Sequence, residues 1–152
     1  MNEIKVGRML LATLAMLVMW IALEVLVEGM IADFVFGRSS SEMWRTVIDT
    51  SGWSGLNAAV SIFIAILNCT IMIWLYASLR PMYGVGTKTA LITSAFGVIL
   101  GFSLFINLMN LGILPVRLGL LEAVFEGIEF PIAMIVGAGV YEGQEKEPSE
   151  AK

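Results

Sequence analysis

Four apolar runs, each about as long as a membrane span, constrain this chain more than any other feature of its sequence. They cover about residues 9–36, 55–79, 89–114 and 116–141. An α-helix rises about 1.5 Å per residue, so about 20 apolar residues cross the roughly 30 Å of hydrocarbon in a bilayer. The runs predict an all-α membrane protein, in which residues 1–141 form a single domain built as a four-transmembrane-helix bundle.

The composition excludes several other classes of protein. Of the 152 residues, 58% are apolar and 14% are charged, whereas soluble domains are about half apolar and about a quarter charged. A disordered chain and a nucleic-acid binder are therefore excluded, and four spans leave no room for a separate soluble domain. We expect the lipid bilayer to surround the chain and no nucleic acid to bind it.

The segments outside the runs have signals of their own. Between the first two spans, Ser39 and Glu42 fit a capping box. After this cap, the helical spacing places Met43, Trp44, Val47 and Ile48 on one apolar face. This pattern predicts a short interfacial helix on the membrane surface, with an irregular loop as the alternative. Residues 142–152 are charged and contain a proline, so we expect a disordered acidic tail.

The basic residues predict the orientation, because Lys and Arg concentrate on the cytoplasmic side of a membrane. With both termini inside, the inner segments contain Lys5, Arg8, Arg80, Lys88, Lys146 and Lys152. The outer segments would then contain Arg38, Arg45 and Arg117. We therefore expect an N-in, C-in protein of the cytoplasmic membrane of a bacterium or archaeon, which is the inner membrane where there are two.

Five glutamates lie inside apolar runs, where an ionisable side chain is costly and marks a functional site by default. Glu24 and Glu28 are four residues apart in the first span and share a helical face. The fourth span has Glu122, Glu126 and Glu129, again on one face. Although these two spans run antiparallel, the helical rise places their carboxyl groups at overlapping depths in the outer half of the membrane. We expect one coupled cluster of carboxyl groups, with Glu129 at its deeper edge.

The other two spans add neutral oxygen ligands in stripes at helical spacing. The second span contributes Asn57, Ser61 and Asn68, and the third contributes Ser103, Asn107 and Asn110. Pro131 has no N–H to donate to the carbonyl oxygen of Gly127, which is then free beside two of the glutamates. If these stripes face inward, the four helices surround an acidic core that is open toward the outside.

Such a core suits hard cations such as Ca²⁺, Mg²⁺ or Mn²⁺, or protons shared among carboxyl groups. The leading hypothesis is a small membrane protein whose acidic cluster binds a cation or protons in transport. Protonated glutamates can instead hold helices together by hydrogen bonds. A third alternative is a non-catalytic accessory or assembly subunit of a larger membrane complex. A homo-oligomer fits any of these hypotheses.

The sequence shows no recognisable catalytic constellation. It contains no histidine and one cysteine, Cys69, so it offers neither a Ser/His/Asp set nor a CxxC motif. Nor does it contain a phosphate-binding loop or a metalloprotease motif. We expect no enzymatic activity and no cofactor beyond a divalent cation.

Overall fold

The computed structural model describes residues 5–27 and 55–143, together with the single positions 34, 37, 42 and 45. Its helices are α1 (Val6–Leu26), α4 (Gly55–Tyr83), α5 (Thr87–Asn110) and α6 (Val116–Glu142). All four are long and apolar enough to cross a membrane, by length and composition. Glu28, most of the predicted interfacial helix and nearly all of the predicted tail lie outside the described residues.

Several helix ends lie at prolines or glycines of the sequence. α4 begins at Gly55, and α6 begins directly after Pro115. α4 continues through Pro81 to Tyr83, and the chain turns at Gly84 and Gly86, whose φ angles are +87° and +109°. These angles favour glycine because it has no Cβ to clash. The connection between α5 and α6 turns at Gly112, with φ +70°.

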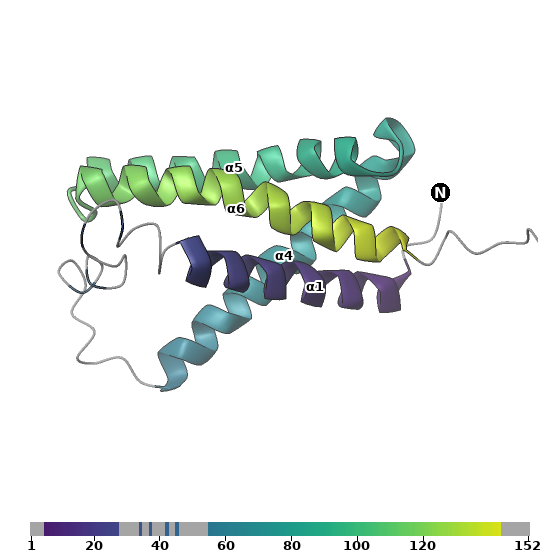
Figure 1. Cartoon of the computed structure of the whole chain (residues 1–152), viewed down its shortest axis with the longest axis horizontal. Coiled ribbons are helices and arrows are strands. Elements are labelled where there is room, and N and C mark those ends of the chain that lie inside the picture. The colour runs from purple at the N-terminus through teal and green to yellow at the C-terminus, as the bar shows by residue number, and fades with distance from the viewer. Residues whose placement is uncertain are drawn as a thin grey trace, which may run out of the picture.

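The helix α6 lies at the centre of the bundle and packs against both α1 and α5 (Figure 1). It is also the most buried helix. Among the described residues, the four largest fully buried side chains are Met16 of α1, Ile73 and Tyr76 of α4, and Met134 of α6 itself. This core lies in the half of the bundle that contains the start of α1, the end of α6 and the turn at 84–86.

Small residues allow the helices to approach closely. A Cβ atom at Gly97 would overlap the ring of Phe130, and one at Gly101 would lie 3.3 Å from Cγ of Glu126. The two glycines of this GxxxG motif on α5 therefore receive side chains of α6 within the same chain. Such a motif can pack helices within one bundle or between protomers, and here it packs two helices of one bundle.

The N-terminal part of α4, which lies far from the turn at 84–86, diverges from the other three helices (Figure 1). The helix crosses α1 steeply, and its side chains from 55 to 64 are all exposed on the chain. Buried residues occur only in its second half, from Cys69 to Tyr76. As a result, α4 and α5 are close at their turn and separate away from it, and this separation forms the pocket described below.

Candidate functional site: an acidic cluster beside an aromatic pocket

Four of the five predicted glutamates lie in the described residues, and the structure brings them together. Glu24 of α1 interacts electrostatically with Glu122 of α6. Glu126 and Glu129 each interact with Glu24 and with Glu122. We call these four residues the acidic cluster. It is formed by one side chain of α1 and three of α6, the pair of helices with the most extensive contact in the bundle.

The members of the acidic cluster differ in their exposure to the surroundings. Glu122 and Glu129 are buried, with 7% and 3% of their surface exposed. Glu126 is half-buried, and Glu24 is exposed on the chain. One oxygen of Glu129, Oε1, is buried without a hydrogen-bond partner. An unpaired buried carboxylate is strongly unfavourable, and a proton or a cation at this group would remove that cost.

The six predicted supporting residues are more exposed than Glu122, Glu126 and Glu129 of the cluster. All of them, Asn57, Ser61, Asn68, Ser103, Asn107 and Asn110, are exposed on the chain. The hydroxyl of Ser103 donates to the carbonyl oxygen of Ile99, one turn earlier in its own helix, at 2.7 Å. Asn68 lines a pocket that also contains Glu126.

The acidic cluster does not by itself form a metal cage. Within the part of the chain that the structure describes, no three His, Cys, Asp or Glu side chains converge closely enough to hold a metal ion. A metal ion at this position would need backbone carbonyl, amide or water oxygens in addition to the carboxylates. Protons place no such demand on the number and geometry of ligands.

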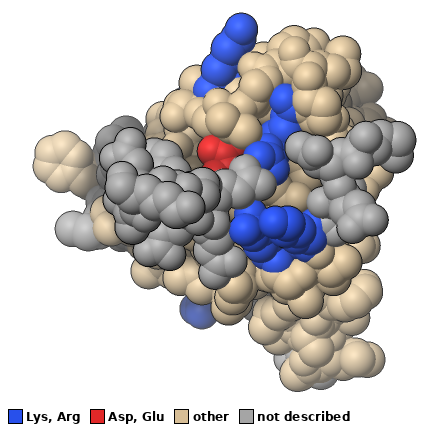
Figure 2. Space-filling model, turned by 90° about the vertical axis from the view of Figure 1, so that its right-hand side faces the viewer, with Lys and Arg blue, Asp and Glu red and all other residues tan. Residues whose placement is uncertain are grey.

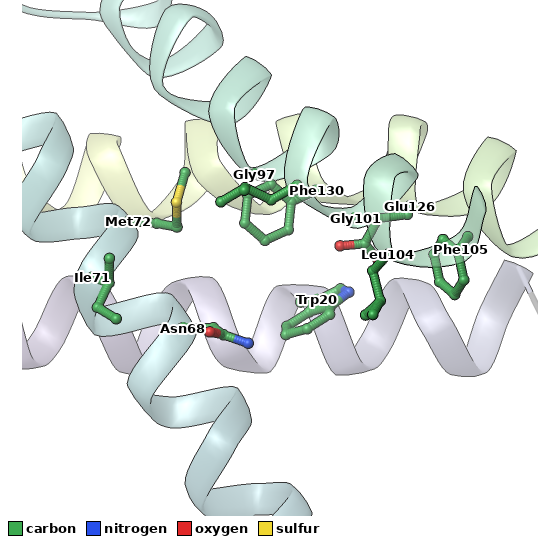
Figure 3. Close-up of a pocket in the computed structure, with 11 residues that line it drawn as sticks. Trp20, Asn68, Ile71, Met72, Gly97, Gly101, Leu104, Phe105, Glu126 and Phe130 are labelled. Atoms are coloured by element: carbon green, nitrogen blue, oxygen red, sulfur yellow. The ribbon is translucent and has the colours of Figure 1, made fainter. Parts of the chain in front are cut away.

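A pocket of about 410 Å³ lies between α4 and α5, with α1 and α6 forming its floor. Figure 3 shows Asn68 of α4 pointing toward Trp20 of α1, and the carboxyl group of Glu126 reaching into the same space. The rings of Trp20 and Phe130 contact each other edge to face, with their centroids 5.9 Å apart. The remaining walls are mostly apolar. We call this space the α4–α5 pocket.

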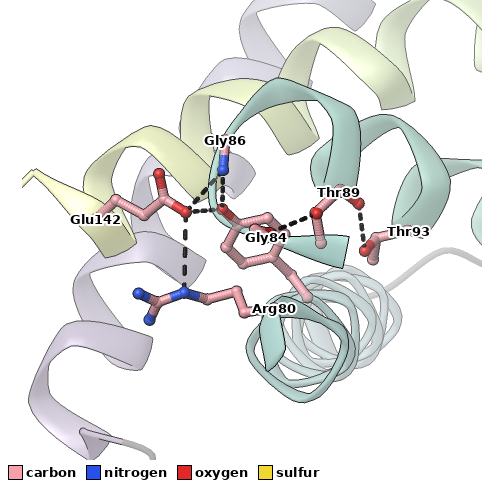
Figure 4. Close-up of polar contacts among 7 residues, drawn as sticks. Arg80, Gly84, Gly86, Thr89, Thr93 and Glu142 are labelled. Atoms are coloured by element: carbon pink, nitrogen blue, oxygen red, sulfur yellow. Dashed lines mark hydrogen bonds and ion pairs between the residues drawn. The ribbon is translucent and has the colours of Figure 1, made fainter. Parts of the chain in front are cut away.

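A second polar group, which the sequence analysis did not single out, lies at the turn between α4 and α5 (Figure 4). The hydroxyl of Tyr76 donates to Oε1 of Glu142, and the backbone N–H of Gly86 donates to the same oxygen at 3.0 Å. Nε of Arg80 lies 3.9 Å from it as an ion pair. We call Tyr76, Arg80, Gly86 and Glu142 the turn cluster. It joins α4, the turn and the end of α6.

Neighbouring contacts support the turn cluster. The Arg80 guanidinium lies over the ring of Tyr141, 5.4 Å from its centroid. The Thr89 hydroxyl donates to the carbonyl oxygen of Gly84 at 2.6 Å, which holds the turn against the start of α5. Two signals in the sequence point to this group. Tyr76 and Arg80 share a helical face, and two glycines follow within the next six residues of Arg80. Glu142 was assigned to the tail in the sequence analysis, but it is the last residue of α6.

Comparisons of this chain with protein-family models, curated proteins and solved structures find no match.

Proposed function

We propose that this chain is an integral membrane protein that binds protons or a cation at the acidic cluster, as a step in transport across the membrane. One observation carries the proposal. Glu129 is 97% buried in a helix apolar enough to span a bilayer, and its Oε1 lacks a hydrogen-bond partner. Three further carboxyl groups lie within electrostatic range of it. Carboxyl groups this close in a low dielectric share protons or a cation.

The donor set favours protons over a dehydrated divalent metal. Ca²⁺ takes six to eight oxygen ligands, and Mg²⁺ requires near-octahedral geometry. Among the described residues, the amide and hydroxyl side chains expected to complete such a shell are exposed, although Asn68 lines the pocket that contains Glu126. A shared proton needs only neighbouring carboxyl groups, and these are supplied by α1 and α6.

The distribution of charge supports an orientation with both termini in the cytoplasm. Lys5, Arg8, Arg80 and Lys88 gather at one end of the bundle, where Figure 2 shows basic side chains around a small acidic patch. Since basic residues concentrate on the cytoplasmic side, this end faces inward. The acidic cluster then lies in the outer half of the membrane.

The orientation gives a prediction that can be checked in cells. A reporter that is active only in the cytoplasm should be active when it is fused after residue 152 and when it is fused before residue 1. The alkaline-phosphatase reporter, which is active only outside, serves as the control and should be active when inserted between α5 and α6, at Gly112. A fusion at either terminus that is active outside would contradict the N-in, C-in orientation.

The proposed binding at the cluster predicts a response of thermal stability to pH and cations. The apparent Tm of the wild-type protein should change as pH is lowered from 8 to 5 or as Ca²⁺, Mg²⁺ or Mn²⁺ is added. Glu129→Gln and Glu122→Gln keep a similar shape but hold no charge, so they should reduce the response.

The matched control for these two variants is Glu42→Gln, an exposed glutamate outside the four helices. It should respond as the wild type does. A wild-type Tm that is insensitive to pH and to all three ions would rule out the proposed binding and leave the glutamates with a structural role.

A second candidate function, an accessory or assembly subunit, is favoured by a different observation. Asn57, Ser61, Asn107 and Asn110 are exposed on helices that are otherwise apolar. In a bilayer such groups gain stability by hydrogen-bonding to another helix. Co-purification of a stoichiometric partner that is lost on replacing Asn107 and Asn110 by leucine would favour this function over the first.

A further inference from the structure

We infer that the α4–α5 pocket binds a hydrophobic organic cation, such as an aryl-substituted ammonium ion, with Glu126 as its counter-ion. This inference rests on the proposed function, because Glu126 belongs to the acidic cluster. It names the class of cation whose charge this carboxylate balances. It goes further by placing that ligand in a pocket outside the buried part of the cluster.

The size and walls of the pocket suit an organic ligand. Its volume of about 410 Å³ lies within the roughly 300–1,000 Å³ that is common for sites of drug-sized molecules. Most of the lining is apolar, and Trp20, Phe105 and Phe130 add aromatic surface. Apolar walls cannot replace the hydration shell of an inorganic ion, so a small metal ion would be a poor occupant.

The charge of the pocket selects a cation among organic ligands. Glu126 contributes a carboxyl group and Asn68 an amide, and the described residues that line the pocket include no Lys or Arg. A neutral apolar ligand, such as a lipid chain, would leave both polar groups without partners, which is unfavourable. An ammonium group beside Glu126 would satisfy the carboxylate, and Trp20 offers an aromatic face for a cation–π contact.

Among the described residues, the charged groups that act on Glu126 are acidic. α1 contributes Glu24, α4 contributes the thiol of Cys69, and α6 contributes Glu122 and Glu129. The α5 wall consists of glycines and apolar side chains, and Gly101 leaves the room in which Glu126 lies. On this inference, the carboxyl group of Glu126 holds a proton when no ligand is bound. Binding of one cation to the carboxylate releases that proton, so charge is balanced.

The test compares two probes of the same shape. One is the (biphenyl-4-ylmethyl)trimethylammonium ion, and the other is its neutral isostere with carbon in place of nitrogen. Both are titrated into the full-length protein in phosphatidylcholine nanodiscs. The fluorescence of Trp20 is followed in a background of Trp44→Phe, Trp53→Phe and Trp74→Phe.

The cation should bind about tenfold more tightly than the isostere, a difference that cation–π and charge pairing readily supply. Its affinity should fall as pH is lowered, because protons compete for Glu126. Glu126→Gln should abolish both the preference and its pH dependence. The control Glu42→Gln should leave both unchanged. Gln is close in shape to a protonated Glu, so we expect the Glu126→Gln variant to fold. A Tm measurement on this variant checks that expectation.

Other outcomes would overturn the inference. Equal binding of both probes would mean that the pocket holds lipid chains without regard to charge. Absence of binding, together with loss of a co-purifying protein in Glu126→Gln, would mean that a basic side chain of a partner fills the pocket. If neither probe binds but the ligand-free protein still responds to pH and inorganic cations, the inference fails while the proposed function stands.

Discussion

Gly137→Leu should destabilise the bundle by about 3 kcal/mol, at the upper end of the range for overpacked cores. A Cβ atom at this position would lie 2.9 Å from Cβ of Met16 and 3.2 Å from the carbonyl oxygen of Ala12. Neither atom is at the end of a flexible side chain, so α1 itself would have to move. Without a hydrophobic force between helices in a bilayer, close packing is a main source of their association. The larger side chain therefore acts against the most extensive interface of the fold.

The matched control is two residues away on the same helix. A Cβ atom at Gly139 meets nothing within 4 Å, and this residue is exposed. Leucine favours helix over glycine by up to about 1 kcal/mol at either position, so the difference between the variants isolates packing. The measurement is the apparent Tm in one detergent. Equal Tm values for Gly137→Leu and Gly139→Leu would contradict the close α1–α6 contact.

The existence of the four helices could be predicted from the sequence, because apolar length alone determines it. The start of α6 directly after Pro115 was also predictable from a local signal, because proline is well tolerated at the start of a helix. The end of α4 was less so. Proline usually ends a helix, yet here the helix ends at the glycines that follow Pro81, because their positive φ angles make the turn.

The neighbours of each side chain could be predicted only in part. Helical spacing places Glu122, Glu126 and Glu129 on one broad face of α6. It does not determine that two of them are buried while the third reaches the α4–α5 pocket, because that depends on how α1, α4 and α5 surround the face. The same holds for Asn57 and Ser61, which are exposed because α4 tilts away from the bundle. No pattern within α4 encodes that tilt.

Tyr76→Phe should destabilise the protein by about 2 kcal/mol, since the hydroxyl is buried and bonded twice. It donates to Oε1 of Glu142 and accepts from the N–H of Gly86 at 3.1 Å. Hydrogen bonds to charged groups contribute about 1.5–3 kcal/mol, and neutral ones about 1 kcal/mol. Tyr83 is exposed near the end of the same helix, so Tyr83→Phe is the matched control and should change the free energy of unfolding by less than about 0.5 kcal/mol.

Glu142→Leu should have a larger effect than Tyr76→Phe, about 3 kcal/mol, because it removes the oxygen that accepts from Tyr76 and Gly86 and that pairs with Arg80. Glu142→Gln retains an acceptor oxygen and should restore more than half of this loss. The double variant Tyr76→Phe/Glu142→Gln should lose less than the sum of the single losses, since both changes act on one hydrogen bond. Apparent Tm values of the wild type, the Tyr76→Phe and Glu142→Gln variants and the double variant measure this coupling. Strict additivity would mean that Tyr76 and Glu142 stabilise the turn separately, and that α6 is not joined to the α4–α5 turn through their contact.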